Sequence, residues 1–309
     1  MTAIPIHAKR QTKHALTARA GLALVAEGGG QRGVFTAGVL DSWQIARFNP
    51  FSILVGTSAG AQNIASYISG QHGYAYSLIT DLTRTTAFFN PWRLFSNRHI
   101  MDLDWYFAQA GNSFYAFDSH QASINSEGRT VRFSTSQSDS FKTTLMDPDK
   151  VGWLPALKLS SAIPYLYKSK QFLDGGVSAP LPIAEAYQLG GENIVSIRTT
   201  RNTPELLTDR VNKLKPLLCG KNRCPKFLQI LDKHSTSYQK TDEFMRSPPN
   251  EVNILEVAPE RELRTKVLGS SKEDIIADYK HGMKVGQKFL QRYGEQLLAQ
   301  KTSDLSMTG

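Results

Sequence analysis

The chain has 309 residues, 40% of them hydrophobic and 20% charged, a composition typical of a globular protein with a large core. No apolar run approaches the ~20 residues that span a bilayer, which argues against a membrane-spanning protein. The formal net charge is +9, and no aromatic–basic module of the kind that binds nucleic acid is visible, so nucleic acid is not an expected partner.

The N-terminal half begins with a basic segment and then alternates strands and helices. Residues 1–20 are interpreted as a mobile basic tail, because Arg19 interrupts the apolar part that a secretory signal would need. Strands are predicted at 21–27 and 51–56, and the helices that follow them at 34–48 and 61–68. A strand–helix–strand unit with short connections implies parallel strands joined by a right-handed crossover.

The rest of the chain is less regular in pattern. Residues 71–128 are rich in aromatic side chains and mix helix and loop signals. Further strands are predicted at 130–136, 193–200 and 252–258, and a helix is expected to end at Pro164. Residues 201–250 are basic, interrupted by prolines and expected to be the least regular part. A long amphipathic helix is predicted over residues 275–297.

A glycine-rich loop, "EGGGQRG", follows the first strand. Gly28, Gly30 and Gly33 satisfy the G-x-G-x-x-G pattern of a dinucleotide-binding loop. Such a site also needs an acidic residue at the end of the second strand, and that strand ends in "VGTSAG" without one. No G-K-[ST] follows the loop either, so a nucleotide is not the expected ligand.

The second strand instead runs into a G-x-S-x-G sequence, Gly56 to Gly60, with Ser58 at its centre. In a strand-to-helix elbow of this type the serine is a strained, exposed nucleophile, and Gly56 and Gly60 relieve crowding around it. The pattern favours acyl transfer with Ser58 as nucleophile.

If Ser58 is the nucleophile, the glycine loop is expected to form the oxyanion hole. Consecutive glycines allow backbone N–H groups to converge on the oxygen that becomes negative in the transition state. Gly29 and Gly30 are the expected donors, and the Ala59 amide is a third candidate. Arg32 either braces the loop or meets a phosphate.

The candidate base is Asp174, which is followed by Gly175 and Gly176 in "DGGVSAP". None of the histidines after Ser58 lies in a short loop after a late strand, where a Ser–His–Asp enzyme would place its base. An aspartate is a weak base with an ordinary pKa of about 3.9, so it must lie within hydrogen-bond reach of Ser58.

Together, the glycine loop, the G-x-S-x-G elbow and the D-G-G motif resemble the patatin-like phospholipase family, in the form of a bacterial stand-alone member. The "SSAIPYL" stretch (160–166) and Pro180 are also similar to that family. The resemblance implies a Ser58–Asp174 dyad without histidine, a three-layer α/β/α sandwich with a mainly parallel central sheet, and lipid acyl hydrolase activity. Glu27 stands where aspartate is common, a difference without an expected chemical effect.

Two alternatives stay open. One is a Ser–His–Asp esterase of another α/β type that uses His234 or His281. The other is a non-catalytic lipid-binding protein of the same fold. The aromatic segment 71–128 is a candidate acyl-chain pocket or lid, or else a satellite core.

No metal or cofactor is expected. His99, Asp102 and Asp104 could suggest a metal site, but Asp102 is expected to open a helix instead. Cys219 and Cys224 are interpreted as ordinary loop thiols.

The organisation that follows is a single catalytic domain at 21–300, with a C-terminal tail at 301–309. The expected substrate is a lipid or another acyl ester. Basic residues concentrate in 1–20 and 201–240, so we expect salt-sensitive contact with an anionic membrane surface through these segments, although a merely solvated face fits the charge equally well. The expected location is the cytoplasm, with peripheral contact at the inner face of the membrane.

Overall fold

The structure is a computed structural model that describes residues 19–96, 98–112, 114–200 and 225–299. The expected tails lie outside these residues, except that the first strand already begins at Arg19. Most of the basic segment after residue 200 lies outside them too, with Cys219 and Cys224.

The centre of the described chain is one mixed sheet in the order β4-β3-β2-β1-β6-β7, with β5 paired to β3. All neighbours from β3 to β7 along this order are parallel, and β4 and β5 run antiparallel to β3. The strands are β1 Arg19–Ala26, β2 Phe51–Thr57, β3 Thr130–Gln137, β4 Thr143–Met146, β5 Phe172–Asp174, β6 Asn193–Ile197 and β7 Asn253–Val257.

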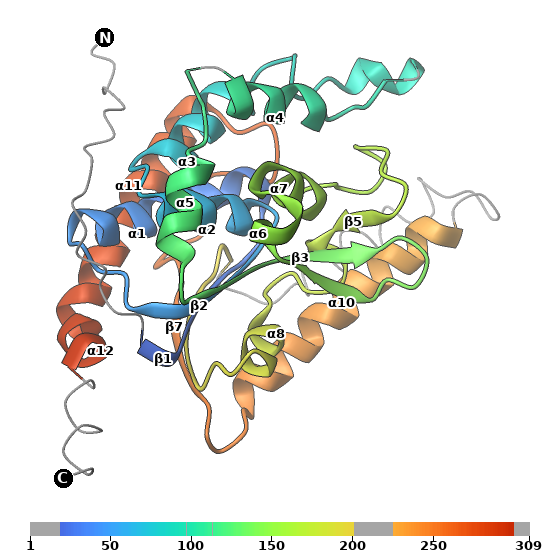
Figure 1. Cartoon of the computed structure of the whole chain (residues 1–309). Coiled ribbons are helices and arrows are strands. Elements are labelled where there is room, and N and C mark those ends of the chain that lie inside the picture. Colours follow the sequence, from blue (N-terminus) through green and yellow to red (C-terminus); the bar gives the residue numbers. More distant parts are fainter. Residues whose placement is uncertain (1–18, 97, 113, 201–224, 300–309) are drawn as a thin grey trace.

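Helices cover both faces of the sheet (Figure 1). The longer ones are α1 Gly33–Ile45, α2 Ala59–Ser69, α4 Leu103–Asn112, α5 Ser119–Ser126, α7 Trp153–Ser160, α10 Pro225–Arg246 and α11 Lys272–Phe289. The shorter ones are η1 Gly30–Arg32, α3 Tyr74–Ser77, η2 Leu78–Leu82, η3 Pro91–Phe95, α6 Pro148–Val151, η4 Gly175–Val177, α8 Ile183–Gln188, η5 Leu290–Gly294 and α12 Glu295–Ala299.

The alternation of β1 divides the core into two layers. Leu22 and Leu24 point to the face packed by α1, α2, α5, α7 and α11, whereas Ala23 and Val25 point to the face packed by α8 and α10. All four side chains are fully buried, as expected for a strand covered on both faces. The predicted three-layer α/β/α sandwich with a mainly parallel sheet is therefore confirmed.

Helices α1 and α11 approach each other closely through glycines. A Cβ added to Gly282 would lie 2.1 Å from the carbonyl oxygen of Phe35, and one added to Gly38 would lie 2.2 Å from that of Tyr279. The Trp43 indole N–H donates to the Gly286 carbonyl at 3.1 Å. This contact fastens the C-terminal helix to the helix that follows the glycine loop.

The expectation that 201–250 is the least regular part of the chain is wrong for its described residues, because α10 is a 22-residue helix, while residues 201–224 lie outside the description. Its apolar positions are sparse, and part of its inward face is polar. Ser237 and Thr241 donate to the carbonyls of Val177 and Leu181 at 3.4 and 3.5 Å. A hydrophobic periodicity cannot detect a face that packs through hydrogen bonds.

The other strands and helices differ from expectation mainly at their ends. Strands β4 and β5 were not predicted, and α7 ends at Ser160, before Pro164. No helix in the described ranges combines the length and the hydropathy needed to cross a membrane.

Candidate active site

Ser58 occupies a sharp turn between β2 and α2. Its backbone has φ 53° and ψ −119°, a region that a residue with a side chain rarely adopts. The turn is tight enough that a Cβ on Gly60 would lie 2.3 Å from the Ala26 carbonyl oxygen, and one on Gly56 would lie 2.7 Å from the Ala61 backbone. Gly60 is therefore required for the elbow to pack against the end of β1, and Gly56 for it to pack against the first turn of α2.

Strand β3 sets the spacing between Ser58 and Asp174. β2 ends with Thr57 opposite Ser134, and β5 places Asp174 opposite the next residue, Thr135. The same stretch of β3 also pairs with β4, so β5 must lie on the edge that β2 occupies. Ser58 and Asp174 thus follow one another along a single strand edge, although 116 positions separate them in sequence.

The "SSA" stretch at 160–162 makes hydrogen bonds with the backbones of both Ser58 and Asp174. The Ser58 amide donates to Ser160 Oγ at 2.9 Å, and that hydroxyl donates to the Ser134 carbonyl at 2.8 Å. The Asp174 amide donates to the Ala162 carbonyl at 2.8 Å. Sequence reasoning used this stretch only as part of the family resemblance and assigned Ser160 no function.

Asp174 is a buried carboxylate with an altered acidity. Its Oδ1 accepts the Gly176 N–H at 2.7 Å, and within the described chain its buried Oδ2 has no hydrogen-bond partner of regular geometry. Burial raises the pKa of Asp174 to about 6, while interaction with the Ser58 hydroxyl and the Gly176 N–H opposes that rise. Loose geometry between catalytic groups is common before substrate binds. Asp174 is therefore largely ionised at neutral pH, with a pKa suited to a general base.

The glycine loop and the start of α2 contain backbone amides that make no hydrogen bond within the described residues. Gly28 donates its N–H to the Pro180 carbonyl at 3.0 Å, whereas Gly29, Gly30 and Ala59 donate to no acceptor in the described residues. Ala59 is the first residue of α2, so its N–H also points from the positive end of a helix. Arg32 braces the loop through Nε to the Gly29 carbonyl at 3.5 Å.

Only glycine fits at Gly29 and Gly30 of the loop. A Cβ on Gly29 would lie 2.7 Å from Thr199 Oγ1. Gly30 has φ +58°, and its Cβ would lie 2.3 Å from the Val267 carbonyl. Gly33 faces Ala59 in the same way, and Gly175 faces the Ser134 carbonyl. The loop is enclosed on several sides by parts of the chain distant in sequence.

Glu27, which had no expected effect, forms the centre of a buried network. One carboxylate oxygen accepts hydrogen bonds from the Thr199 amide and hydroxyl, and the other accepts the Tyr238 hydroxyl at 2.7 Å. Thr199 Oγ1 also lies 3.1 Å from the Gly28 carbonyl, directly before the unused amides. No sequence signal identified this network, because its three members are far apart in the chain.

A largely apolar cavity that is partly open to solvent lies at Ser58. Gly30, Ser58 and Ala59 line it at the elbow, and its other polar lining residues are Gln31, Gln62, Asn63, Thr83 and Ser161. Its apolar wall comes mainly from the aromatic-rich segment and is formed by Ala75, Ile79, Phe88, Met101, Leu103, Tyr106, Ile163 and Leu268. The cavity therefore has the polarity expected for an acyl chain that ends in an ester.

The two histidines considered as bases have other partners. His234 donates from Nδ1 to the Gly176 carbonyl at 2.5 Å, and burial lowers its pKa. His281 accepts the Glu260 amide at 3.0 Å and packs on the Phe35 ring. In the described structure neither makes a hydrogen bond with Ser58.

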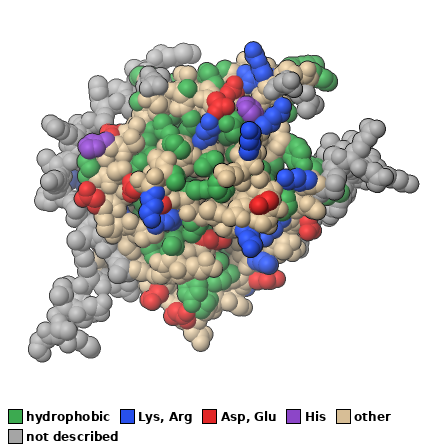
Figure 2. All heavy atoms as spheres, turned by 45° about the vertical axis from the view of Figure 1, so that its right-hand side comes forward, with side chains coloured by type: hydrophobic (Ala, Val, Ile, Leu, Met, Phe, Trp, Pro, Cys, Tyr) green, Lys and Arg blue, Asp and Glu red, His purple; other side chains and the backbone are tan. Residues whose placement is uncertain are grey.

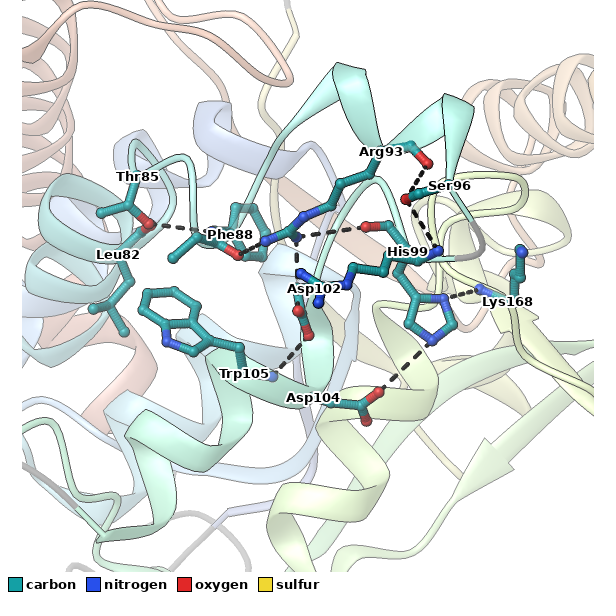
Figure 3. A network of polar contacts seen from close by, with 12 residues as sticks. Leu82, Thr85, Phe88, Arg93, Ser96, His99, Asp102, Asp104, Trp105 and Lys168 are labelled. Atoms are coloured by element: carbon teal, nitrogen blue, oxygen red, sulfur yellow. Dashed lines mark hydrogen bonds and ion pairs between the residues drawn. The ribbon is translucent and has the colours of Figure 1, made fainter.

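The residues considered for a metal belong to a separate polar network (Figure 3). Asp102 caps α4 by accepting the Trp105 amide at 2.9 Å, as the sequence predicts, and lies 3.6 Å from the Arg93 guanidinium. Asp104 accepts hydrogen bonds from Lys158 and the Tyr167 hydroxyl.

The chain belongs to the patatin-like phospholipase family, a family of lipid acyl hydrolases, whose model matches residues 24–187. A second model, a domain of unknown function (DUF6363), matches residues 224–298. YjjU, an uncharacterized protein of Escherichia coli (strain K12), is 35% identical over 286 residues, which are 91% of this chain and 80% of that protein.

Solved structures with a similar fold are more distant. VipD from Legionella pneumophila has a TM-score of 0.44 and 12% identity over 89% of this chain and 67% of that chain. Human GIVD cytosolic phospholipase A2, in complex with methyl gamma-linolenyl fluorophosphonate, has a TM-score of 0.45 and 12% identity over 94% and 61%.

Proposed function

We propose that this protein hydrolyses lipid acyl esters with Ser58 as nucleophile and Asp174 as general base. The observation that carries the proposal is the interaction of the Asp174 carboxyl with Ser58, which lies on a strained elbow and lines a largely apolar cavity. Membership of a lipid acyl hydrolase family supports the same reaction class.

The reaction begins when Ser58 Oγ attacks the ester carbonyl carbon and its proton passes to Asp174. The carbonyl oxygen becomes negative and accepts the N–H groups of Gly29, Gly30 and Ala59. When the intermediate collapses, the alcohol leaves with the proton from Asp174, and the acyl group stays on Ser58. Water then attacks the acyl-enzyme, with Asp174 again accepting the proton. When this second intermediate collapses, the bond between Ser58 Oγ and the acyl carbon breaks, the proton returns from Asp174 to Ser58 Oγ, and the free acid leaves.

The cavity indicates which half of the substrate lies inside. Its lining is mostly apolar, and Ser58 is one of the lining residues. We infer that the acyl chain occupies the cavity and that the alcohol half, with any headgroup, lies toward solvent. Phospholipids and simpler long-chain esters both satisfy this requirement.

The test is hydrolysis of p-nitrophenyl butyrate by the wild type and by Ser58→Ala and Asp174→Ala. We expect each variant to lose at least about 10³-fold in kcat/KM. Ser126→Ala is the control, because Ser126 is a buried serine that bonds Asp149 instead. An alkyl fluorophosphonate should label Ser58, as located by peptide mass spectrometry.

The outcomes separate the three functions considered. Retained activity in Ser58→Ala would contradict the nucleophile assignment. Loss of turnover in His234→Gln or His281→Gln, with activity kept in Asp174→Asn, would favour a Ser–His–Asp esterase. Neither turnover nor labelling in the wild type would favour a lipid-binding protein without activity.

A further inference from the structure

The cavity wall continues into a projecting hairpin-like excursion, residues 88–96 and 98–102, which we name the aromatic finger. Its two arms meet at the base, where Phe89 and Met101 form an antiparallel bridge. The Asn90 amide donates to the Ile100 carbonyl at 2.9 Å. Phe88 and Met101 at this base line the cavity. Figure 1 shows the finger as the teal segment that projects at the upper right.

The tip of the finger exposes two aromatic rings. Trp92 and Phe95, both on η3, are 78% and 83% exposed, the highest values for large hydrophobic side chains among the described residues. Their ring centroids are 6.4 Å apart, so they form one apolar projection. Such side chains are normally withdrawn from water, and their exposure here suggests a partner.

Polar contacts within the finger and with the neighbouring segment hold it in place (Figure 3). Arg93 donates to the Ala87 carbonyl at 3.1 Å and pairs with Asp102 on the returning arm at 3.6 Å. The Lys168 amide donates to His99 Nδ1 at 3.0 Å, which joins the finger to the segment that follows α7. These contacts fix the tip in its projecting position.

The surroundings of the finger are cationic. Arg98 on the finger is exposed, and so are Lys168 and Lys170 on the adjoining segment. The two acids nearby, Asp102 and Asp104, are paired with Arg93 and Lys158. In Figure 2, Lys and Arg side chains lie beside hydrophobic side chains in the upper right of the face shown.

We propose that the aromatic finger docks this protein on anionic phospholipid bilayers, with Trp92 and Phe95 inserted among the lipids. Tryptophan favours the membrane interface, and flanking cations attract anionic headgroups. Two rings offer about 300–500 Å² of contact, short of the ~800 Å² per partner of a stable protein interface, whereas a membrane needs no matching surface.

The proposal rests on the proposed function, because docking brings the cavity entrance to the acyl chains. Phe88 and Met101 connect the inserted tip to the cavity wall. An acyl chain can then enter from the bilayer along the finger without crossing water. The basic segments 1–18 and 201–224 lie outside the described residues and are not needed for this step.

The experiment is flotation of the full chain with phosphatidylcholine vesicles that contain 30% phosphatidylglycerol. We expect the Trp92→Ala/Phe95→Ala variant to bind at least tenfold more weakly than the wild type. The control is Ile45→Ala, which removes a side chain that is 63% exposed at the end of α1 far from Ser58. Arg98→Gln/Lys170→Gln should weaken binding about tenfold, and only when anionic lipid is present.

A second measurement locates the inserted ring. Lipids with brominated acyl chains should quench tryptophan fluorescence in the wild type and much less in Trp92→Phe. The remaining tryptophans, Trp43, Trp105 and Trp153, are buried or partly buried. Unchanged binding in the double alanine variant, equal quenching in Trp92→Phe, or a wild type that does not bind vesicles would each overturn the proposal.

Docking and catalysis fail separately in this design. The finger variant should hydrolyse dissolved p-nitrophenyl butyrate like the wild type, and Ser58→Ala should float like the wild type without hydrolysis. A wild type that binds through the finger but hydrolyses no ester would refute the proposed function alone. An active enzyme whose finger variant still binds vesicles would refute docking alone.

Discussion

The Tyr238 hydroxyl donates a 2.7 Å hydrogen bond to the Glu27 carboxylate across 211 positions of the sequence. Burial raises the pKa of Tyr238 well above its ordinary value, and the neighbouring Glu27 carboxylate adds to the rise, so the phenol keeps its proton and acts as the donor. Glu27 directly precedes the glycine loop, and Tyr238 lies within the region of the second family model. The two matched regions are therefore joined at the candidate oxyanion hole.

We expect Tyr238→Phe to destabilise the fold by about 1–3 kcal/mol, because a buried carboxylate oxygen loses its donor. It should also lower kcat more than it changes KM, since the loop amides would shift. Urea unfolding and ester kinetics measure the two effects. The matched control is Tyr187→Phe, whose hydroxyl donates to Glu251 at the surface. Equal effects of the two substitutions would contradict the assigned importance of the buried bond.

Ester hydrolysis should depend on the ionisation of Asp174. Because burial raises its pKa to about 6, the base becomes protonated below that pH. We expect kcat/KM to be level above about pH 7 and to fall tenfold per pH unit well below 6. A pH–rate profile with a non-ionisable ester provides the measurement. A decline centred near pH 4 would mean that Asp174 has an ordinary acidity in the free enzyme.

The same burial means that the ionised carboxylate of Asp174 lowers the free energy of unfolding. The pKa of an aspartate in water is 3.8, and that of Asp174 in the fold is about 6, so the folded state disfavours the charged form of Asp174. Below about pH 4 both states hold the proton and the penalty is absent; it grows as the pH rises to 6 and then stays constant. Asp174→Asn should therefore gain thermal stability over the wild type between pH 4.5 and 7, by up to roughly 3 kcal/mol. A gap that shrinks with rising pH would refute this assignment.

The backbone at Ser58 provides a further test of the elbow. Glycine tolerates φ 53° and ψ −119°, whereas alanine keeps the strain of serine. Ser58→Gly should have a free energy of unfolding higher than that of Ser58→Ala by on the order of 1 kcal/mol, and should therefore unfold at a higher temperature. Both variants should be inactive. If the alanine variant is the more stable, the turn is not strained in the folded protein.

Ser160 should matter through position rather than chemistry. Ser160→Ala leaves the Ser58 amide and the Ser134 carbonyl without their shared partner, which costs about 1–3 kcal/mol. We expect kcat to fall about tenfold or more with the pH profile unchanged. Ser126→Ala removes another buried serine and should affect stability without affecting kcat. A Ser160→Ala enzyme with normal kcat would leave Ser160 a purely structural role.

The sequence predicted the elements around Ser58 because their signals are local. The strand at 51–56 and the helix at 61–68 correspond to β2 and α2, and the parallel pairing of β1 with β2 follows from the strand–helix alternation. The three-layer sandwich was expected from the family resemblance. Asp102 was also predicted to open a helix, and it caps α4.

The rest depends on contacts between distant residues. The sequence of the three residues of β5 does not predict a strand. β5 forms only because β3 extends past the end of β2 and offers it an edge to pair with. The partner of Glu27 lies on α10, whose polar inner face hides its helical pattern. The role of Ser160 likewise exists only once Ser58 and Ser134 are neighbours.

The placement of β2 and β5 end to end along β3 also bears on how such enzymes can diversify. Between α2 and β3 runs one stretch of chain, residues 70–129, that supplies most of the apolar residues of the cavity wall and the aromatic finger. Recombination that exchanges this stretch between relatives would change acyl-chain and membrane preference together. The register that sets the Ser58–Asp174 spacing would pass through such an exchange intact, so specificity can evolve without the reacting groups moving.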